Sequence, residues 1–120
     1  MNIVIIEQNT IYRKSLKTVL SQIDDFKIVF DSDNGDYLDQ IPSAHIDLIL
    51  LDFSIEKTEC NEIINKAIAR WQLVKIILLV YFKEDWKNNL RGVTDFIFKN
   101  STKKEFVNKI RETQLNKQKQ

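Results

Sequence analysis

The stretch Asp47-Leu48-Ile49-Leu50-Leu51-Asp52 decides the fold, because it is an apolar run of strand length that ends in a carboxylate. A continuous run of Ile and Leu is typical of a central strand in a parallel sheet, where helices cover both faces. A later run, at residues 96–98, ends at Lys99. Neighbouring parallel strands share one crevice at their carboxyl ends, so we expect Asp52 and Lys99 to face each other across it.

Five apolar runs alternate with segments of helical period. They lie at residues 2–6, 27–30, 46–51, 76–82 and 96–98. The apolar faces of three helices consist of Ile11, Tyr12, Leu16, Val19, Leu20 and Ile23; of Ile63, Ile64, Ala67 and Ile68; and of Phe106, Val107 and Ile110. Repeated βα units predict an α/β fold, a doubly wound five-stranded parallel sheet flanked by helices. The second and fifth runs are shorter and more mixed, which indicates edge strands.

Local signals mark the start of the last of these helices and one further, short helix. Thr102 and Glu105 have the spacing of a capping box, in which each side chain accepts from a free backbone N–H group at the helix start. Asp33-Asn34-Gly35 is a turn signal before a short helix at residues 37–41, which Pro42 ends. A further helix between residues 80 and 92 has the weakest pattern.

Composition restricts the class of protein. The 120 residues fit one domain, residues 1–120. The formal net charge is +1, from 18 basic and 17 acidic residues, which gives no electrostatic argument for binding nucleic acid or a membrane. No apolar run approaches the roughly 20 residues that span a bilayer. The single cysteine, Cys60, cannot form an internal disulfide, and no basic leader precedes the first strand, so we expect a cytoplasmic protein.

Together with Ile3-Val4-Ile5-Ile6-Glu7-Gln8, the runs that end at Asp52 and Lys99 resemble the receiver domain of bacterial two-component response regulators, over nearly the whole chain. The resemblance implies a flavodoxin-like receiver fold with strand order 2-1-3-4-5, in which Glu7, Gln8 and Asp52 share one crevice. It also implies a signalling module rather than an enzyme. Asp52 would be the phosphoacceptor for a histidine kinase or phosphotransfer protein, and Lys99 would pair with the phosphoryl oxygens.

Most receivers have two adjacent acids after the first strand, which hold Mg²⁺ together with the phosphoacceptor. Here the matching residues are Glu7 and Gln8. Magnesium is usually held by one or two carboxylates, water and phosphate, and a glutamine carbonyl can ligate it but brings no charge. We therefore expect weakened or lost Mg²⁺ binding at Glu7, Gln8 and Asp52, and less repulsion within the empty site.

The resemblance also locates a conformational switch. A hydroxyl residue ends the fourth strand in the family, and this chain has Val80 there. A hydrogen bond to a charged group contributes roughly 1.5 to 3 kcal/mol, while driving an equilibrium from 1:99 to 99:1 takes about 5.5 kcal/mol, so the missing hydroxyl removes a large share of the switch. Phe96 matches the aromatic switch position, and an ordinary core phenylalanine is the equal alternative.

Other departures lie beside the crevice. The loop after Asp52 is expected to differ, because the family methionine, proline and glycine are replaced by Ile55, Glu56 and Cys60. Asn100 follows Lys99 where most receivers have a proline after a cis bond, and a trans bond is expected here. Residues 92–112 are most similar to receivers of helix-turn-helix regulators. The segment between residues 80 and 92 is about three residues shorter than usual, so its helix is expected to lose a turn.

Three functions compete. The first is a phosphoacceptor receiver, favoured by Asp52, Lys99 and Glu7. The second is a pseudo-receiver, an interaction module that phosphorylation does not control, favoured by Gln8 and Val80. The third, an aspartate-nucleophile phosphohydrolase, is disfavoured because Ser54 stands where such enzymes have a second aspartate.

The partners are less defined by the sequence. Tyr81, Phe82 and Trp86 are either a binding anchor or aromatics that close the end of the core. An output domain beyond residue 120, an output partner and a homodimer are all compatible with the sequence. His45 and Cys60 are assigned no catalytic role.

Overall fold

The structure, a computed structural model, describes residues 1–42, 45–82 and 90–119 of the chain, with side chains up to residue 115. Its elements are β1 (Asn2–Ile6), α1 (Thr10–Ser21), β2 (Lys27–Ser32), η1 (Leu38–Gln40), β3 (Leu48–Asp52), α2 (Lys57–Arg70), β4 (Lys75–Val80), β5 (Asp95–Phe98) and α3 (Lys103–Lys119). The expected helix between residues 80 and 92, and Trp86 with it, falls largely outside the described residues.

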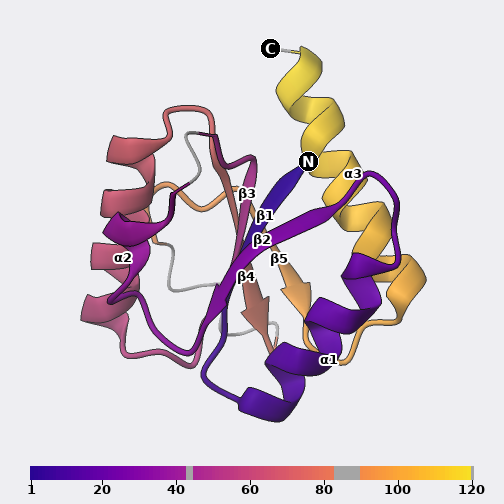
Figure 1. Ribbon diagram of the computed structural model, residues 1–120, viewed down its shortest axis with the longest axis horizontal. Coiled ribbons are helices and arrows are strands. Elements are labelled where there is room, and N and C mark those ends of the chain that lie inside the picture. The colour runs from indigo at the N-terminus through magenta and orange to yellow at the C-terminus, as the bar shows by residue number, and fades with distance from the viewer. Residues whose placement is uncertain (43–44, 83–89, 120) are drawn as a thin grey trace.

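The five strands form one parallel sheet in the order β2-β1-β3-β4-β5. Helices α1 and α3 cover one face of the sheet, and α2 covers the other with η1 (Figure 1). Strands β1, β3 and β4 lie inside the sheet and are almost wholly buried, while β2 and β5 are the half-buried edges. The α/β fold, the strand order and the edge positions predicted from the sequence are confirmed.

Alternate residues of the central strands supply two separate cores. Ile3 and Ile5 pack on the α1 and α3 side, while Val4 and Ile6 pack on the α2 side. The predicted helix faces fit this division except at two residues, Ile11 and Ile68, and Ile68 is 38 % exposed. Ile11 is 80 % exposed, because the first turn of α1 extends past the end of the sheet (Figure 1). The prediction that Ile11 belongs to the core face was wrong.

The helix ends follow the local chemistry of the sequence. Glu105 N–H donates to Thr102 Oγ1 at 3.2 Å and Thr102 N–H donates to Glu105 Oε1 at 2.8 Å, which confirms the capping box. The helix expected at residues 37–41 is only the 3-10 turn η1. Arg70 on α2 donates to the Leu38 carbonyl at 2.7 Å and to the Ile41 carbonyl, so a side chain satisfies backbone groups there.

Two further features bear on the site. No peptide bond among the described residues is cis, so the expected trans bond before Asn100 is confirmed. Gly92 has a φ of +90°, a conformation that favours glycine, and it lies against α2 just before β5. Within the described ranges, no helix is both long and apolar enough to cross a bilayer.

Candidate functional site

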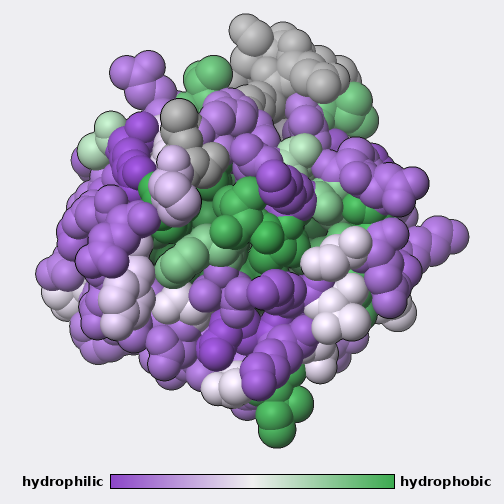
Figure 2. Space-filling view, viewed as in Figure 1, coloured by the Kyte–Doolittle hydropathy of each residue, from purple (hydrophilic) through white to green (hydrophobic). Residues whose placement is uncertain are grey.

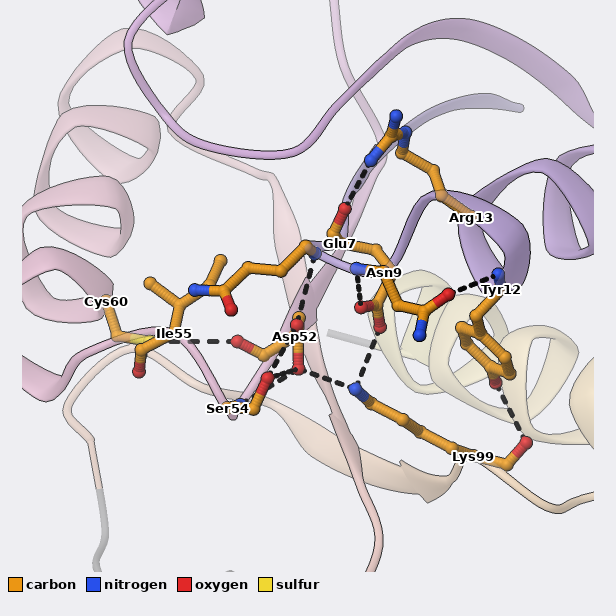
Figure 3. Close-up of polar contacts among 10 residues, drawn as sticks. Glu7, Asn9, Tyr12, Arg13, Asp52, Ser54, Ile55, Cys60 and Lys99 are labelled. Carbon is orange, nitrogen blue, oxygen red and sulfur yellow. Dashed lines mark hydrogen bonds and ion pairs between the residues drawn. The ribbon is translucent and has the colours of Figure 1, made fainter.

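Three charged side chains meet at the carboxyl ends of the strands. Asp52 is the last residue of β3, Glu7 follows β1, and Lys99 follows β5. Lys99 Nζ lies 2.6 Å from Asp52 Oδ1 and 2.9 Å from Glu7 Oε1 (Figure 3). The side chains of both acids are fully buried and that of Lys99 is 4 % exposed. The site is therefore a buried ion cluster in which two carboxylates share one ammonium.

The two oxygens of Asp52 are hydrogen-bonded unequally. Oδ1 accepts from Lys99 Nζ and from Ser54 N–H at 2.9 Å, while Oδ2 accepts from Gln8 N–H at 3.2 Å. Ser54 Oγ lies 2.8 Å from both oxygens, but its single proton serves one of them at a time. Oδ2 is thus the more weakly bonded oxygen. The sequence pointed to Ser54 only as a missing aspartate, and its contact with Asp52 was not predicted.

Glu7 is less well satisfied than Asp52. Its Oε2 accepts from Asn9 N–H at 2.9 Å, within the turn that begins α1. Its Oε1 forms an ion pair with Lys99 but has no hydrogen-bond partner among the described residues. Arg13 donates to the Glu7 backbone carbonyl at 2.7 Å and fixes the chain at this point. A buried carboxylate oxygen without a directed hydrogen bond remains.

These contacts set the protonation of the cluster. Burial alone would raise the pKa of Asp52, but its contacts with Glu7, Lys99 and Ser54 outweigh burial and lower that pKa. Burial raises the pKa of Glu7, and the neighbouring Asp52 carboxyl raises it further. The pKa of Lys99 is raised, because the two acids outweigh the opposing effect of burial. As the pH falls, Glu7 is therefore the first of the two acids to take a proton, and Asp52 stays ionised to lower pH.

Two tyrosines surround the lysine. Lys99 Nζ lies 4.7 Å from the centre of the Tyr81 ring and 5.7 Å from that of Tyr12. The Tyr12 hydroxyl donates to the Lys99 backbone carbonyl at 2.9 Å and ties α1 to the end of β5 (Figure 3). The sequence indicated Tyr12 only as part of a helix face, because nothing local in a sequence links residues 87 positions apart.

The sequence also placed Gln8, Val80 and Phe96 at the site. Gln8 is exposed and reaches Asp52 through its backbone N–H group. Val80 is 1 % exposed and packs in the α2-side core, and Phe96 packs against the same core. The Phe96 ring contacts Phe98 edge to face, with ring centres 5.3 Å apart.

The loop after Asp52 is built around the residues that replace the family pattern. Ile55 is buried, and the Glu56 side chain caps α2 by accepting from the Thr58 and Glu59 N–H groups. The Cys60 thiol is buried, with Sγ 3.3 Å from the Ile55 carbonyl oxygen. Burial raises the pKa of Cys60 to about 12, so the thiol stays protonated and unreactive at neutral pH.

An open cavity of about 290 Å³ lies beside the ion cluster. Its lining comes from the ends of β3, β4 and β5: Phe53, Ser54, Leu79, Val80, Tyr81, Phe82 and Lys99. Ser54 and Lys99 both contact Asp52, so a group bound in this cavity would lie next to the Asp52 carboxylate. Tyr81 and Phe82 are 55 % and 67 % exposed at its mouth.

The residues fit a divalent cation in part. Over the described parts of the chain, no three His, Cys, Asp or Glu side chains are grouped so as to hold a metal. Glu7 and Asp52 nevertheless offer two buried carboxylates, and Glu7 Oε1 lacks a hydrogen bond. Two carboxylates completed by water or phosphate suit Mg²⁺. The Lys99 ammonium, however, already lies between the two acids.

The sequence comparisons identify one family. Residues 3–111 match the profile of the response regulator receiver domain. The transcriptional regulatory protein DegU of Brevibacillus brevis is 28 % identical over 80 residues, which cover 66 % of this chain and 34 % of DegU, so the chain spans about a third of that relative.

Solved structures show the same fold at low identity. The response regulatory domain of MrkE from Klebsiella pneumoniae is 19 % identical with a TM-score of 0.75, and all of both chains is covered. A chain in the complex of the CheA3 P1 domain with CheY6 from R. sphaeroides is 23 % identical with a TM-score of 0.81, over 95 % of this chain and 96 % of that one. The receiver domain of the putative response regulator NarL from Mycobacterium tuberculosis is 19 % identical with a TM-score of 0.77, over 92 % and 93 %.

Proposed function

Since the chain belongs to the response regulator receiver family, a non-enzymatic signalling module of two-component signal transduction, we propose that Asp52 is its phosphoacceptor. The 2.6 Å contact between Lys99 Nζ and Asp52 Oδ1 carries the proposal. It keeps Asp52 ionised, as a nucleophile must be, and it places a cation where phosphoryl oxygens would gather. The cavity beside Ser54 and Lys99 gives the donor room to approach.

The transfer uses the weaker-bonded oxygen of Asp52. Oδ2 attacks the phosphorus of a phosphohistidine, a P–O bond forms, and the P–N bond breaks. The imidazole leaves with that electron pair and takes up a proton. Ser54 Oγ must leave Oδ2 for this step, and its N–H group continues to hold Oδ1. Lys99 then pairs with the transferred phosphoryl oxygens as well as with Oδ1.

Receivers typically bind Mg²⁺, and we assign that role here to Glu7 and Asp52. A bound Mg²⁺ would neutralise the charge on the phosphoryl oxygens. Gln8 would reach it only by turning its exposed side chain inward, and it would add no charge. Binding is therefore proposed to be weak.

Receiver domains interact with histidine kinases. The proposed donor is accordingly a histidine kinase or a phosphotransfer protein, and residues 1–120 are proposed to be one receiver domain. The greater length of DegU suggests an output domain beyond residue 120, which would respond to phosphorylation of the receiver.

A second candidate is a pseudo-receiver that acts as a phosphorylation-independent interaction module. Two observations favour it. Val80 is buried and carries no hydroxyl, so its side chain offers no hydrogen bond to a phosphoryl group. Ser54 and Lys99 already donate hydrogen bonds to the Asp52 carboxylate, so the site is stabilised without a phosphoryl group.

The deciding experiment is intact-mass analysis after incubation with acetyl phosphate over a range of Mg²⁺ concentrations. A single phosphate adduct that the Asp52→Asn variant lacks would support the phosphoacceptor. The Ser54→Ala variant should form the adduct faster, because its Oδ2 is not covered. If the folded wild-type protein and Ser54→Ala both stay unmodified, the second candidate replaces the first.

A further inference from the structure

We propose that Tyr81 is a latch that holds the Lys99 ammonium between Glu7 and Asp52, and so sets how readily a divalent cation enters the site. The latch is a contact between the face of the Tyr81 ring and the ammonium. It rests on the proposed metal role of Glu7 and Asp52 but does not involve phosphorylation.

The Lys99 ammonium lies between two kinds of negative surface, carboxylate oxygens and the face of an aromatic ring. Carboxylate oxygens of Asp52 and Glu7 lie 2.6 and 2.9 Å from Nζ, and the Tyr81 ring centre lies 4.7 Å from it. The face of an aromatic ring is negative and attracts a cation within about 6 Å. The Lys99 side chain is 4 % exposed although Tyr81 itself is 55 % exposed, so the tyrosine lies at the surface and the lysine beneath it.

Tyr81 is the adjustable part of this cage. Tyr12 lies farther from the ammonium, at 5.7 Å, and its hydroxyl is fixed on the Lys99 backbone carbonyl. Tyr81 directly follows β4, at the mouth of the cavity, where a change of its rotamer would uncover Nζ without disturbing either core.

The ammonium and a divalent cation would use the same oxygens. Glu7 and Asp52 each direct one oxygen at Nζ, and a cation bound by both acids would lie within a few ångströms of the ammonium. Like charges at that distance repel strongly in a buried site. Magnesium binding therefore requires Lys99 to move, and whatever retains Lys99 lowers the affinity for Mg²⁺.

The test is a calorimetric Mg²⁺ titration of purified variants without any phosphodonor. Tyr81→Leu removes the ring face and should bind Mg²⁺ about 2- to 30-fold more tightly than the wild type, the range that a cation–π contact represents. Tyr81→Phe keeps the ring and should match the wild type. Phe82→Leu is the matched control, because it removes a neighbouring exposed aromatic ring, and it should leave the affinity unchanged.

Two further measurements separate the latch from simple steric access. Hydrogen exchange at the Lys99 ammonium, followed by NMR, should be faster in Tyr81→Leu than in the wild type and Tyr81→Phe. In a Lys99→Met background, Tyr81→Leu should no longer change the affinity for Mg²⁺, because no ammonium remains to be retained.

Several outcomes would overturn the latch. The first is an unchanged Mg²⁺ affinity in Tyr81→Leu, and a lack of Mg²⁺ binding by every variant counts as this outcome. The second is an equal change of affinity in Tyr81→Leu and Phe82→Leu. The third is an effect of Tyr81→Leu that persists in the Lys99→Met background. Failure of the proposed function is distinguishable, since it appears as a missing phosphate adduct and leaves these titrations untouched.

Discussion

Replacing Lys99 with methionine tests whether the buried cluster holds the fold together. The change keeps a long unbranched side chain and removes the ammonium that two acids share. It leaves Asp52 and Glu7, both fully buried, without a counter-charge. The Lys109→Met variant is the matched control, because Lys109 pairs with Asp95 at 3.3 Å but is 35 % exposed.

The size of the effect follows from the distances. With an effective dielectric constant of about 20, contacts of 2.6 and 2.9 Å correspond to about 6 kcal/mol each. Desolvation of the ammonium offsets several kcal/mol of that sum, and breaking a buried pair typically costs about 3 to 5 kcal/mol. We expect Lys99→Met to lower the free energy of unfolding by an amount in that range at neutral pH. The control should lose about 0 to 1 kcal/mol, as exposed ion pairs do.

The dependence on pH identifies the cause. The pKa of Asp52 is lowered from 3.8, so its contribution is present above that value and lost as the pH falls through the folded pKa. The pKa of Lys99 is raised from 10.5, so its contribution is present below that value and lost as the pH rises through the folded pKa. The difference in the free energy of unfolding between the wild type and Lys99→Met should therefore be largest between neutral pH and about pH 10. It should shrink in acid, where neutral carboxyl groups need no counter-charge.

Urea unfolding followed by circular dichroism at several pH values measures this gap. A loss below about 1 kcal/mol at neutral pH would mean that the cluster contributes no more than a surface pair. A gap that widens in acid would refute the assignment of the loss to unpaired carboxylates. Adding Asp52→Asn to Lys99→Met should recover part of the stability, since one of the two buried charges is then gone.

Three further predictions concern the surroundings of the cluster. Burial raises the pKa of Glu7 above 4.5, so the stability of the wild type relative to Glu7→Gln should fall as the pH rises from 4.5 through the folded pKa. Urea unfolding of both proteins at the two ends of this pH range measures the difference in stability. A difference that does not change with pH contradicts the prediction. Val80→Thr should cost about 1 to 3 kcal/mol in thermal unfolding, because Val80 is buried in an apolar core. That cost should narrow with acetyl phosphate only if the hydroxyl turns to a phosphoryl group. Gly92→Ala should cost about 1 to 3 kcal/mol, because of the φ of +90° and a Cβ only 2.4 Å from Ile68 Cδ1. Adding Ile68→Val should relieve only the steric part, and full recovery in urea unfolding would show that the backbone is not strained.

The strands and most of the helices could be predicted from the sequence, because they depend on local periodicity. The continuous apolar runs gave the three central strands, and the spacing of Thr102 and Glu105 gave the last helix start. Ile11 has the right spacing for the core but lies in a turn beyond the sheet, which periodicity alone does not reveal. The short helix after Gly35 shrank to a 3-10 turn, with Arg70 bonding its backbone from α2.

The site was predictable only as far as strand ends determine it. Asp52, Glu7 and Lys99 meet because the parallel sheet brings the ends of β1, β3 and β5 to one edge. The contacts of Tyr12 and Tyr81 with Lys99 depend on side-chain rotamers and on pairs that are distant in sequence, which no local pattern encodes.

The substitution at Gln8 and the position of Lys99 are linked by charge balance. Two carboxylates and one ammonium leave the cluster with a single negative charge, which hydrogen bonds from Ser54 and from the Gln8 and Asn9 backbone N–H groups can stabilise. A third carboxylate at position 8 would raise that charge by one and would favour a divalent cation over the ammonium. The neutral Gln8 therefore favours the lysine-held state, in the same direction as the proposed Tyr81 latch.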